Sequence, residues 1–313
     1  MKIALIGPGI MPIPPKGWGA VEILIWDYYN ELTSQGHNVT IINTPNKNEI
    51  IEKVNSGSFD FVHLHYDCFY DILNLLKCPK IAITSHYPYI DNINKHQYDG
   101  YVNIFNFLIN NRKYYNFVLA EKDMKTFIQY GADPKYLFKI KNGINSKAFL
   151  FNDTPLNDKT IYLGKITQRK NQYKFQHIKN IDFAGNVDDQ MFNVKNSNYL
   201  GEWDRNTLHT KLTEYSNLLL ISDGEADPLV VKEALIAGLG VVVNKSSAEN
   251  LEETDFITII DDNRTYDIDY IMEMVEQNKI ISSLKRSEIH EYGVNHYDIG
   301  NEVKRYIEII ERL

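Results

Sequence analysis

The stretch that decides the fold spans residues 221–238 and reads ISDGEADPLVVKEALIAG. It lies between two short apolar runs, residues 217–220 and 239–243. Turn-forming residues follow the first run, and an apolar segment of helical length leads into the second, so the pattern indicates strand, loop, helix and strand. This order predicts a βαβ unit, from which parallel α/β sheets are built.

The helix of this unit has well-marked ends in the sequence. Asp227 suits the N-cap, Pro228 suits the first helical position, and Gly238 suits the left-handed residue that ends a helix. Between them the sequence is apolar apart from Lys232 and Glu233. A helix that is apolar on nearly every face is typical of a buried helix, so the Glu233 carboxylate needs a partner there.

A second carboxylate, Glu225, lies in the loop between the strand and this helix. Ligands of open α/β sheets bind beyond the carboxyl ends of the strands, which is where this loop begins. Glu225 and Glu233 are therefore the first candidate site residues.

Composition narrows the class of protein. The 313 residues suit one large domain or two ordinary ones, and 43% hydrophobic with 24% charged residues is typical of a globular protein. The net charge of −8 argues against a nucleic-acid partner, because that requires a basic face. No apolar run approaches the length of a membrane span, and the first apolar residues suit a buried strand better than a signal sequence. We expect a cytoplasmic protein with at most peripheral membrane contact.

The first half of the chain alternates strands with helical or irregular segments. Buried strands are predicted at residues 2–7, 37–42, 59–65, 80–85, 116–120 and 137–141. A helix is predicted at residues 20–32, after a long loop rich in proline and glycine. Gly17, Trp18 and Gly19 end this loop, where backbone N–H groups and the helix dipole can bind an anion. The alternative is that these glycines only make turns.

Histidine and cysteine side chains in this half have two possible uses each. His86 follows the strand at residues 80–85, so it either donates a hydrogen bond to a substrate or serves the structure. His63 and His65 share one face of a strand but lack a third ligand at a sensible spacing, so packing is favoured over a metal. Cys68 and Cys78 are expected to be small core residues, rather than a disulfide or a zinc site.

The second half repeats the architecture after a polar, breaker-rich segment, residues 151–158, that has the composition of a linker. Further strands are predicted at residues 160–163, 181–184 and 256–260, and helices at residues 205–215, 270–278 and 301–312. We therefore predict a Rossmann-like N-terminal domain at residues 1–152 and a second such domain at residues 153–290. Residues 291–313 are expected to pack back on the first domain.

A basic loop follows the first strand of the second half. Lys165, Arg169 and Lys170 fall within six residues, next to the strand end. Cations in that position can neutralise a diphosphate and stabilise it as it leaves. A solvated basic surface is the alternative.

Together these residues resemble the retaining glycosyltransferases of the GT-B fold, in the family 4 group that uses nucleotide-sugar donors. The most specific match is the spacing of Glu225 and Glu233, which corresponds to the E-x7-E motif of that family. Further matches, in the family's order, are Gly17-Trp18-Gly19 with Glu22, Asn142-Gly143-Ile144-Asn145, Gly164-Lys165 with Lys170, and Tyr199-Leu200-Gly201. The resemblance covers the whole chain and implies an α/β protein of two Rossmann-like lobes, with the donor site in the cleft between them.

The resemblance also implies a role for each candidate residue. Glu233 would hold the ribose hydroxyls of the sugar donor, and Glu225 the hydroxyls of the transferred sugar. Lys170 would bind the diphosphate, and His86 would lie beside the reacting sugar. The implied catalytic residues are Glu225, His86 and Lys170. The implied donor-binding residues are Gly17, Trp18, Gly19, Lys165, Arg169, Lys170, Asp227, Leu229, Val230 and Glu233.

The implied reaction moves a hexose-type sugar from a UDP-sugar, or next a GDP-sugar, to a saccharide or other hydroxyl acceptor. Retention by front-face attack is implied, with no cofactor and no metal. Asp267-Ile268-Asp269 has the spelling of a metal motif, but it begins a predicted helix, where acids suit the dipole. A UDP-sugar epimerase of the same fold and a non-catalytic nucleotide-sugar-binding protein are the alternatives.

The chain departs from the family pattern at two places. Asp227 and Pro228 stand where the family has phenylalanine and glycine, so the Asp227 carboxylate either caps the helix or turns outward to bind sugar hydroxyls. Lys165 replaces an arginine and loses its bidentate geometry, for which Arg169 can compensate.

Overall fold

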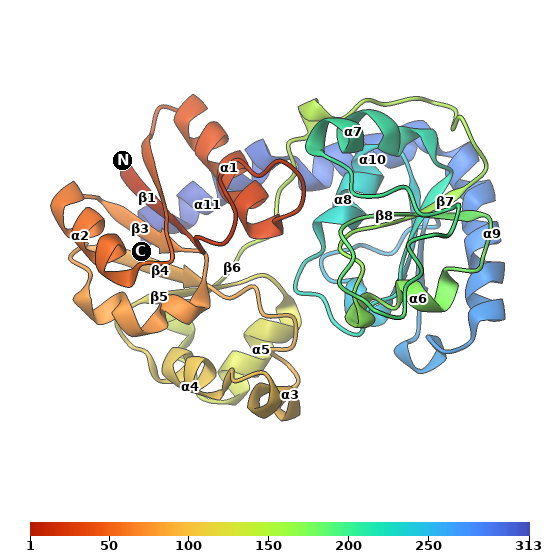
Figure 1. The fold of residues 1–313 in the computed structure, drawn as a ribbon. Helices are drawn as coiled ribbons and strands as arrows, with labels where there is room; N and C mark the ends of the chain where they lie inside the picture. The colour runs from red at the N-terminus through yellow and green to blue at the C-terminus, as the bar shows by residue number, and fades with distance from the viewer. The chain divides into compact units, whose positions relative to one another are not determined.

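The computed structural model describes residues 1–313, which fall into two compact units (Figure 1). The first unit contains Met1–Pro15, Gly19–Gly143 and Ile299–Leu313. The second contains Lys16–Trp18 and Ile144–Asp298. Each unit holds one parallel sheet with its own helices, so the predicted α/β architecture of two repeated units is confirmed.

The sheet of the first unit has six strands in the spatial order β2-β1-β3-β4-β5-β6, all parallel. The strands are β1 (Lys2–Gly7), β2 (Asn38–Asn43), β3 (Phe61–Leu64), β4 (Lys80–Thr84), β5 (Tyr115–Val118) and β6 (Leu137–Lys139). The helices are α1 (Ala20–Ser34), α2 (Lys47–Gly57), α3 (Ile93–Tyr98), α4 (Val102–Asn110), α5 (Glu121–Gln129) and α11 (Ile299–Arg312). The 3₁₀ segments are η1 (Asp67–Leu75) and η2 (Pro134–Tyr136).

Both faces of this sheet are covered, which explains why its strands are apolar without strict alternation. On one face Val62 of β3 belongs to the same core as Leu108 of α4. On the other face Phe61 and Phe117 pack edge-on against the Tyr306 ring of α11, with ring centroids 6.1 and 6.0 Å away. The last helix of the chain therefore completes the core of the unit that contains the first strand.

The sheet of the second unit has five strands in the order β11-β10-β9-β7-β8, again all parallel. The strands are β7 (Thr160–Leu163), β8 (Ile181–Ala184), β9 (Asn217–Leu220), β10 (Gly240–Asn244) and β11 (Ile257–Ile260). The helices are α6 (Gln172–Phe175), α7 (Arg205–Lys211), α8 (Leu229–Ile236), α9 (Ile268–Leu284) and α10 (Arg286–Tyr297). The 3₁₀ segments are η3 (Ser146–Ala148), η4 (Gln168–Lys170), η5 (Leu212–Glu214), η6 (Lys245–Ser247) and η7 (Asp262–Arg264).

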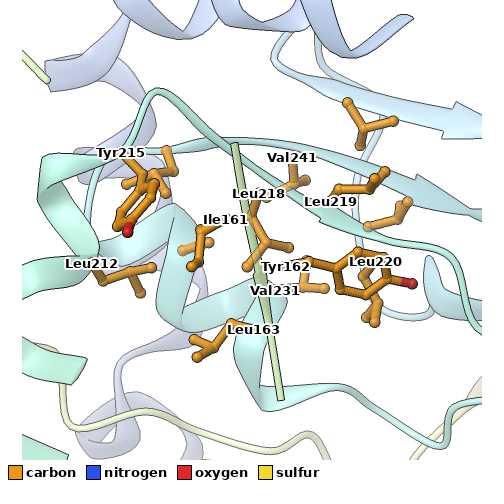
Figure 2. Packing of buried hydrophobic residues seen from close by; sticks show 14 of the residues in the cluster. Ile161, Tyr162, Leu163, Leu212, Tyr215, Leu218, Leu219, Leu220, Val231 and Val241 are labelled. Atoms are coloured by element: carbon orange, nitrogen blue, oxygen red, sulfur yellow. The ribbon is translucent and has the colours of Figure 1, made fainter. Parts of the chain in front are cut away.

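The core of the second unit lies where the sheet meets α8 (Figure 2). Ile161, Leu218 and Val241 are register partners on β7, β9 and β10, and none has exposed surface. Val231 of α8 is buried in the same cluster. Full burial of each such side chain contributes about 1.5–3 kcal/mol, so this layer holds the βαβ unit together.

All predicted strands are found, with ends shifted by at most two residues. Helix lengths were predicted less well. The predicted helix at residues 270–278 extends to Ile268–Leu284, because its buried face continues through the polar residues Lys279 and Ser282. The one predicted at residues 205–215 ends as an α-helix at Lys211 and continues as the 3₁₀ segment η5.

The prediction for the start of the central helix was wrong. Leu229 is its first residue, and Pro228 occupies the N-cap with an extended backbone and makes no side-chain cap. The Asp227 carboxylate instead pairs with the Lys232 ammonium at 2.5 Å. Gly238 has the left-handed backbone predicted for it, with φ of +86°.

The expectation that both cysteines lie in the core was also wrong. Cys68 is exposed and Cys78 is half-buried, and both are free. Cys68 lies on the outer side of η1, between the buried residues Asp67 and Phe69. No helix of the chain is both long enough and apolar enough to cross a membrane.

The second unit begins and ends at neighbouring points of its own structure. The Ile144 N–H donates to the Tyr297 carbonyl at 2.8 Å, and Ile144 forms an isolated parallel bridge with Asp298. The Ser146 hydroxyl donates to the Asp298 carboxylate. In the first unit, Gly143 lies against Ile299, because a Cβ on this glycine would be 2.8 Å from the Ile299 Cα.

The strand orders place a topological switch point in each sheet. In the second unit the chain runs from β7 outward to β8 and then returns to β9, on the other side of β7. The connections from β7 and β9 therefore lead in opposite directions, and α/β proteins bind ligands in the crevice that this leaves. The loops at this point are residues 164–171, after β7, and residues 221–228, after β9.

Candidate functional site

The two loops at the switch point of the second sheet are hydrogen-bonded to each other. The Asp223 N–H donates to the Arg169 carbonyl at 2.8 Å. The Asn171 side-chain amide donates to the Asp223 carboxylate, also at 2.8 Å. The basic loop and the loop that carries Glu225 therefore form one structure.

A tyrosine hydroxyl beneath these loops reinforces the connection. Tyr162 lies on β7 with no exposed surface, and its hydroxyl accepts from the Ile221 N–H at 2.8 Å. The same hydroxyl donates to the Lys170 carbonyl. Burial raises the pKa of Tyr162, so the hydroxyl remains protonated and able to donate. An aromatic residue in a strand carries no sequence signal for this function.

Two glycines shape the loop after β7. Gly164 has φ of +126°, a conformation that side chains rarely adopt. A Cβ at Gly185 would be 2.0 Å from the Gly164 carbonyl oxygen, so the ends of β7 and β8 approach closely only because Gly185 lacks a side chain. The Lys170 ammonium lies 3.5 Å from the position that a Gly164 Cβ would take. Gly164 is therefore required for its backbone conformation, and the Lys170 ammonium lies in ordinary contact distance beside it.

Glu225, Arg169 and Lys170 form a compact cluster of charges. Glu225 Oε1 lies 2.7 Å from the Arg169 guanidinium and 3.1 Å from the Lys170 ammonium. The side chains of Glu225 and Lys170 are only 10% and 11% exposed. Burial alone would raise the pKa of Glu225, but Lys170 and Arg169 outweigh it and hold that pKa below its ordinary value. The cluster is therefore an ionised carboxylate with two cations.

Glu233 has a partner that the sequence did not suggest. On α8 its side chain is 3% exposed, and Oε1 lies 2.7 Å from the guanidinium of Arg205 at the start of α7. The two residues are 28 positions apart. From the sequence alone, an arginine at the start of a helix is expected to be solvent-exposed. No signal in the sequence therefore identifies the pair of Arg205 and Glu233.

Asp227 is turned inward. Its side chain has no exposed surface, and that of its partner Lys232 is 1% exposed. The Lys232 ammonium also lies over the Tyr297 ring, 5.4 Å from its centroid. Leu229 and Val230 form the first helical turn directly after Pro228. The donor-binding roles of Asp227, Leu229 and Val230 stay predictions, and the Asp227 carboxylate already serves as a structural partner.

Lys165 lies apart from the charge cluster. Its ammonium pairs with Asp188 at 2.8 Å and lies over the ring of Trp18, 5.3 Å from the centroid. Gly17 lies beside Glu202, because a Cβ there would be 2.5 Å from the Glu202 carboxylate. Lys16–Trp18 thus belongs to the second unit through these contacts.

Gly19 belongs to the first unit and begins α1. It occupies the N-cap of that helix with φ of +121° and contributes no side-chain cap. Glu22, in the first turn, is buried and accepts a hydrogen bond from the Met11 N–H at 3.3 Å.

His86 lies in the first unit, half-buried beside the buried residues His63 and His65. Its ring centroid is 6.1 Å from that of His65, and burial lowers the pKa of His86 to about 4. His63 is bonded through both ring nitrogens, to the Tyr306 hydroxyl at 2.7 Å and the Thr84 hydroxyl at 2.6 Å. His63 therefore has the packing role that the sequence favoured, and His86 is neutral at pH 7.

The structure thus brings only some of the predicted residues together. One cluster contains Glu225, Arg169 and Lys170, whereas Lys165, Glu233 and Asp227 each pair with a different side chain. Gly19 and His86 belong to the other unit. No group of three or more His, Cys, Asp or Glu side chains is arranged to hold a metal ion.

Comparisons with known proteins bear on the fold. No family profile and no curated protein sequence matches the chain. Among solved structures, AviGT4, a glycosyltransferase involved in avilamycin A biosynthesis, is 15% identical with a TM-score of 0.69, and the match covers 100% of this chain and 98% of that one. Sucrose-phosphate synthase from Thermosynechococcus elongatus is 12% identical with a TM-score of 0.74, at the same coverage. HepE of Anabaena, solved in complex with UDP-glucose, is 14% identical with a TM-score of 0.71, and both chains are covered completely.

These matches span the whole chain and show its fold. The protein has the GT-B fold of two α/β domains that these glycosyltransferases share. At such low identity the particular reaction is a matter for the site residues.

Proposed function

We propose that the protein is a retaining glycosyltransferase of the family 4 type, which transfers a hexose-type sugar from a nucleoside-diphosphate sugar to a saccharide or other hydroxyl acceptor. The observation that carries this proposal is the cluster of Arg169, Lys170 and Glu225 at the switch point of the second sheet. A UDP-sugar is the preferred donor, followed by a GDP-sugar. The crystallised complex of HepE with UDP-glucose supports a UDP-sugar on this fold.

The two cations suit the departure of a nucleoside diphosphate. When the bond between the sugar C1 and the phosphate oxygen breaks, negative charge develops on the diphosphate. Lys170 is nearly buried, so its charge acts through a medium that screens less than water. Glu225 stays ionised beside it and can accept hydrogen bonds from sugar hydroxyls. Glu233 would accept from the ribose hydroxyls in the same way.

The proposed reaction is a front-face substitution. The acceptor oxygen bonds to C1 on the face that the diphosphate leaves, and a phosphate oxygen takes the acceptor's proton. His86 would lie beside the reacting sugar as a neutral hydrogen-bonding group. The two cations supply the positive charge, so we expect turnover to persist after dialysis against EDTA.

The test is transfer or donor hydrolysis with a panel of UDP- and GDP-sugars. Lys170→Ala is expected to lower kcat by about 100-fold or more, the usual cost of removing a group that stabilises developing charge. Glu233→Ala is expected to weaken donor binding. Lys174→Ala, which removes a cation that lies over the Tyr173 ring, is the matched control and should leave kinetics unchanged. Unchanged kinetics in both site variants would overturn the site assignment.

The same panel separates the alternatives. An epimer that forms from a UDP-sugar without any acceptor, detected by NMR, would identify an epimerase. Calorimetric binding of UDP with no turnover under any acceptor would identify a binding protein.

A further inference from the structure

We propose that Arg205 is a positioning residue for the sugar donor, which orients the Glu233 carboxylate for the ribose hydroxyls. The inference rests on the proposed function, because it assumes that Glu233 meets a ribose. Arg205 acts through Glu233 and does not itself touch the sugar nucleotide. The role rests on the contact between Arg205 and Glu233, which are 28 positions apart in the sequence.

The backbone of Arg205 is held at a defined place. Asp204 is the N-cap of α7, and its carboxylate accepts from the Thr207 N–H at 2.7 Å. Arg205 is the first residue of that helix, so its side chain starts from a fixed point. The guanidinium reaches Glu233 Oε1 at 2.7 Å.

Burial makes this contact important for the carboxylate. The Glu233 side chain is 3% exposed, and that of Arg205 is 21% exposed. A carboxylate removed from water needs a cation or hydrogen-bond donors, and removing its partner leaves an uncompensated charge. Arg205 holds one oxygen of Glu233, which restricts the rotation of the carboxylate and the directions of its remaining lone pairs.

A vicinal diol makes strict demands on such a carboxylate. The two ribose hydroxyls donate hydrogen bonds in directions that the sugar ring sets, so a carboxylate free to rotate would lose part of the binding free energy to ordering. A carboxylate already held by a guanidinium does not have this cost. Arg205 therefore tunes the affinity for the nucleotide more than the chemical step.

The backbone of Arg205 has a separate contact that leaves the side chain free to be tested. Its N–H donates to the Lys16 carbonyl at 3.3 Å, which anchors Lys16–Trp18. Substituting the side chain keeps this N–H. A side-chain variant thus removes the Glu233 contact and preserves the contact with the glycine-containing segment.

The experiment measures the binding of UDP and of 2′,3′-dideoxy-UDP by calorimetry, together with KM and kcat for the UDP-sugar. Arg205→Ala is expected to weaken UDP binding by about 10- to 100-fold, the range for one charge-assisted hydrogen bond, and to raise KM more than it lowers kcat. Binding of the dideoxy analogue should be unchanged. Arg205→Lys should recover part of the affinity for UDP. Lys211→Ala, an exposed cation at the end of the same helix, is the control and should behave as the unaltered protein.

Each outcome decides a separate point. If the unaltered protein binds UDP and Arg205→Ala binds it equally well, the role of Arg205 is overturned and the proposed function stands. An equal loss for UDP and the dideoxy analogue would show a merely structural role and overturn it as well. Failure of the unaltered protein to bind UDP or GDP overturns both proposals. Should Arg205→Ala not fold, Arg205→Gln keeps a polar side chain with N–H donors on a shorter stem, and the comparison of the two nucleotides remains decisive.

Discussion

A single carboxylate, Asp227, lies just before the helix that carries Glu233 and pairs with a lysine of that helix. Pro228 follows it in an extended conformation, so the helix starts one residue later than its sequence suggests. Asp227 and Lys232 are both buried and paired at 2.5 Å, which ties the loop after β9 to the helix. Charges in such surroundings are costly unless both members of the pair are present.

The first prediction concerns this pair. Asp227→Asn should lower the free energy of unfolding by about 3–5 kcal/mol, because it leaves the Lys232 ammonium buried without its carboxylate. Urea denaturation followed by circular dichroism measures this change. The control is Asp267→Asn, which alters the half-exposed pair with Arg264 and should leave the free energy of unfolding nearly unchanged, because exposed ion pairs contribute little. Equal losses in the two variants would contradict the assigned role of burial.

At the scale of secondary-structure elements, the important feature is the connection between the loops after β7 and β9. A backbone hydrogen bond from Asp223 to Arg169 and a side-chain hydrogen bond from Asn171 to Asp223 join them. The Tyr162 hydroxyl is bonded to one backbone group of each loop. The loops carry Lys170 and Glu225, so the geometry of the charge cluster depends on a residue that lies in the core.

The second prediction follows from that dependence. Tyr162→Phe should reduce stability by about 1–3 kcal/mol, since it leaves buried backbone groups without a partner, and it should also reduce transferase turnover. Tyr215→Phe is the matched control, because it removes a buried hydroxyl bonded to Asp182 elsewhere in the same unit. Both variants should lose stability in thermal unfolding, but only Tyr162→Phe should lose turnover. A turnover loss in both would indicate a general loss of folding.

The elements themselves were largely predictable from the sequence. Buried parallel strands are short apolar runs closed by turn residues. The left-handed conformation of Gly238 was predictable because a glycine at the end of a helix commonly adopts it. The charge cluster was predictable in part, since Lys170 and Glu225 both follow strands at one sheet edge. The Arg205–Glu233 pair and the Asp227–Lys232 pair were not, because side-chain partners depend on how α7, α8 and their loops pack.

At the scale of the whole molecule, buried histidines influence the response to acid. Burial lowers the pKa of His86 to about 4 and those of His63 and His65 well below their ordinary values. An unfolded chain binds protons at these histidines from about pH 6.5 downward, whereas the folded chain does not. The unfolded state therefore gains protons first, and stability falls as the pH drops from about 6.5 toward 4.

The third prediction isolates one of these histidines. Thermal unfolding of the protein should show a falling melting temperature between pH 6.5 and 4.5. His86→Gln removes a contribution of up to about 3 kcal/mol to this dependence, so its melting temperature should fall less steeply. His177→Gln changes an exposed histidine and should keep the original slope. Identical slopes in all three proteins would contradict the assignment.

The bonded ends of residues 144–298, which form the second unit apart from Lys16–Trp18, make this segment an insertion within the chain of the first. Ile144 contacts Tyr297 and Asp298 within the second unit. Gly143 and Ile299, the adjoining residues of the chain, are neighbours within the first unit. A very short linker between Gly143 and Ile299 would connect the segment after β6 directly to α11 and keep the first unit in one chain. The excised segment could be circularly permuted at its paired ends. The same geometry allows residues 144–298 to be exchanged as one segment during evolution. Such an exchange would replace Arg169, Lys170 and Glu225 without interrupting the core of the first unit.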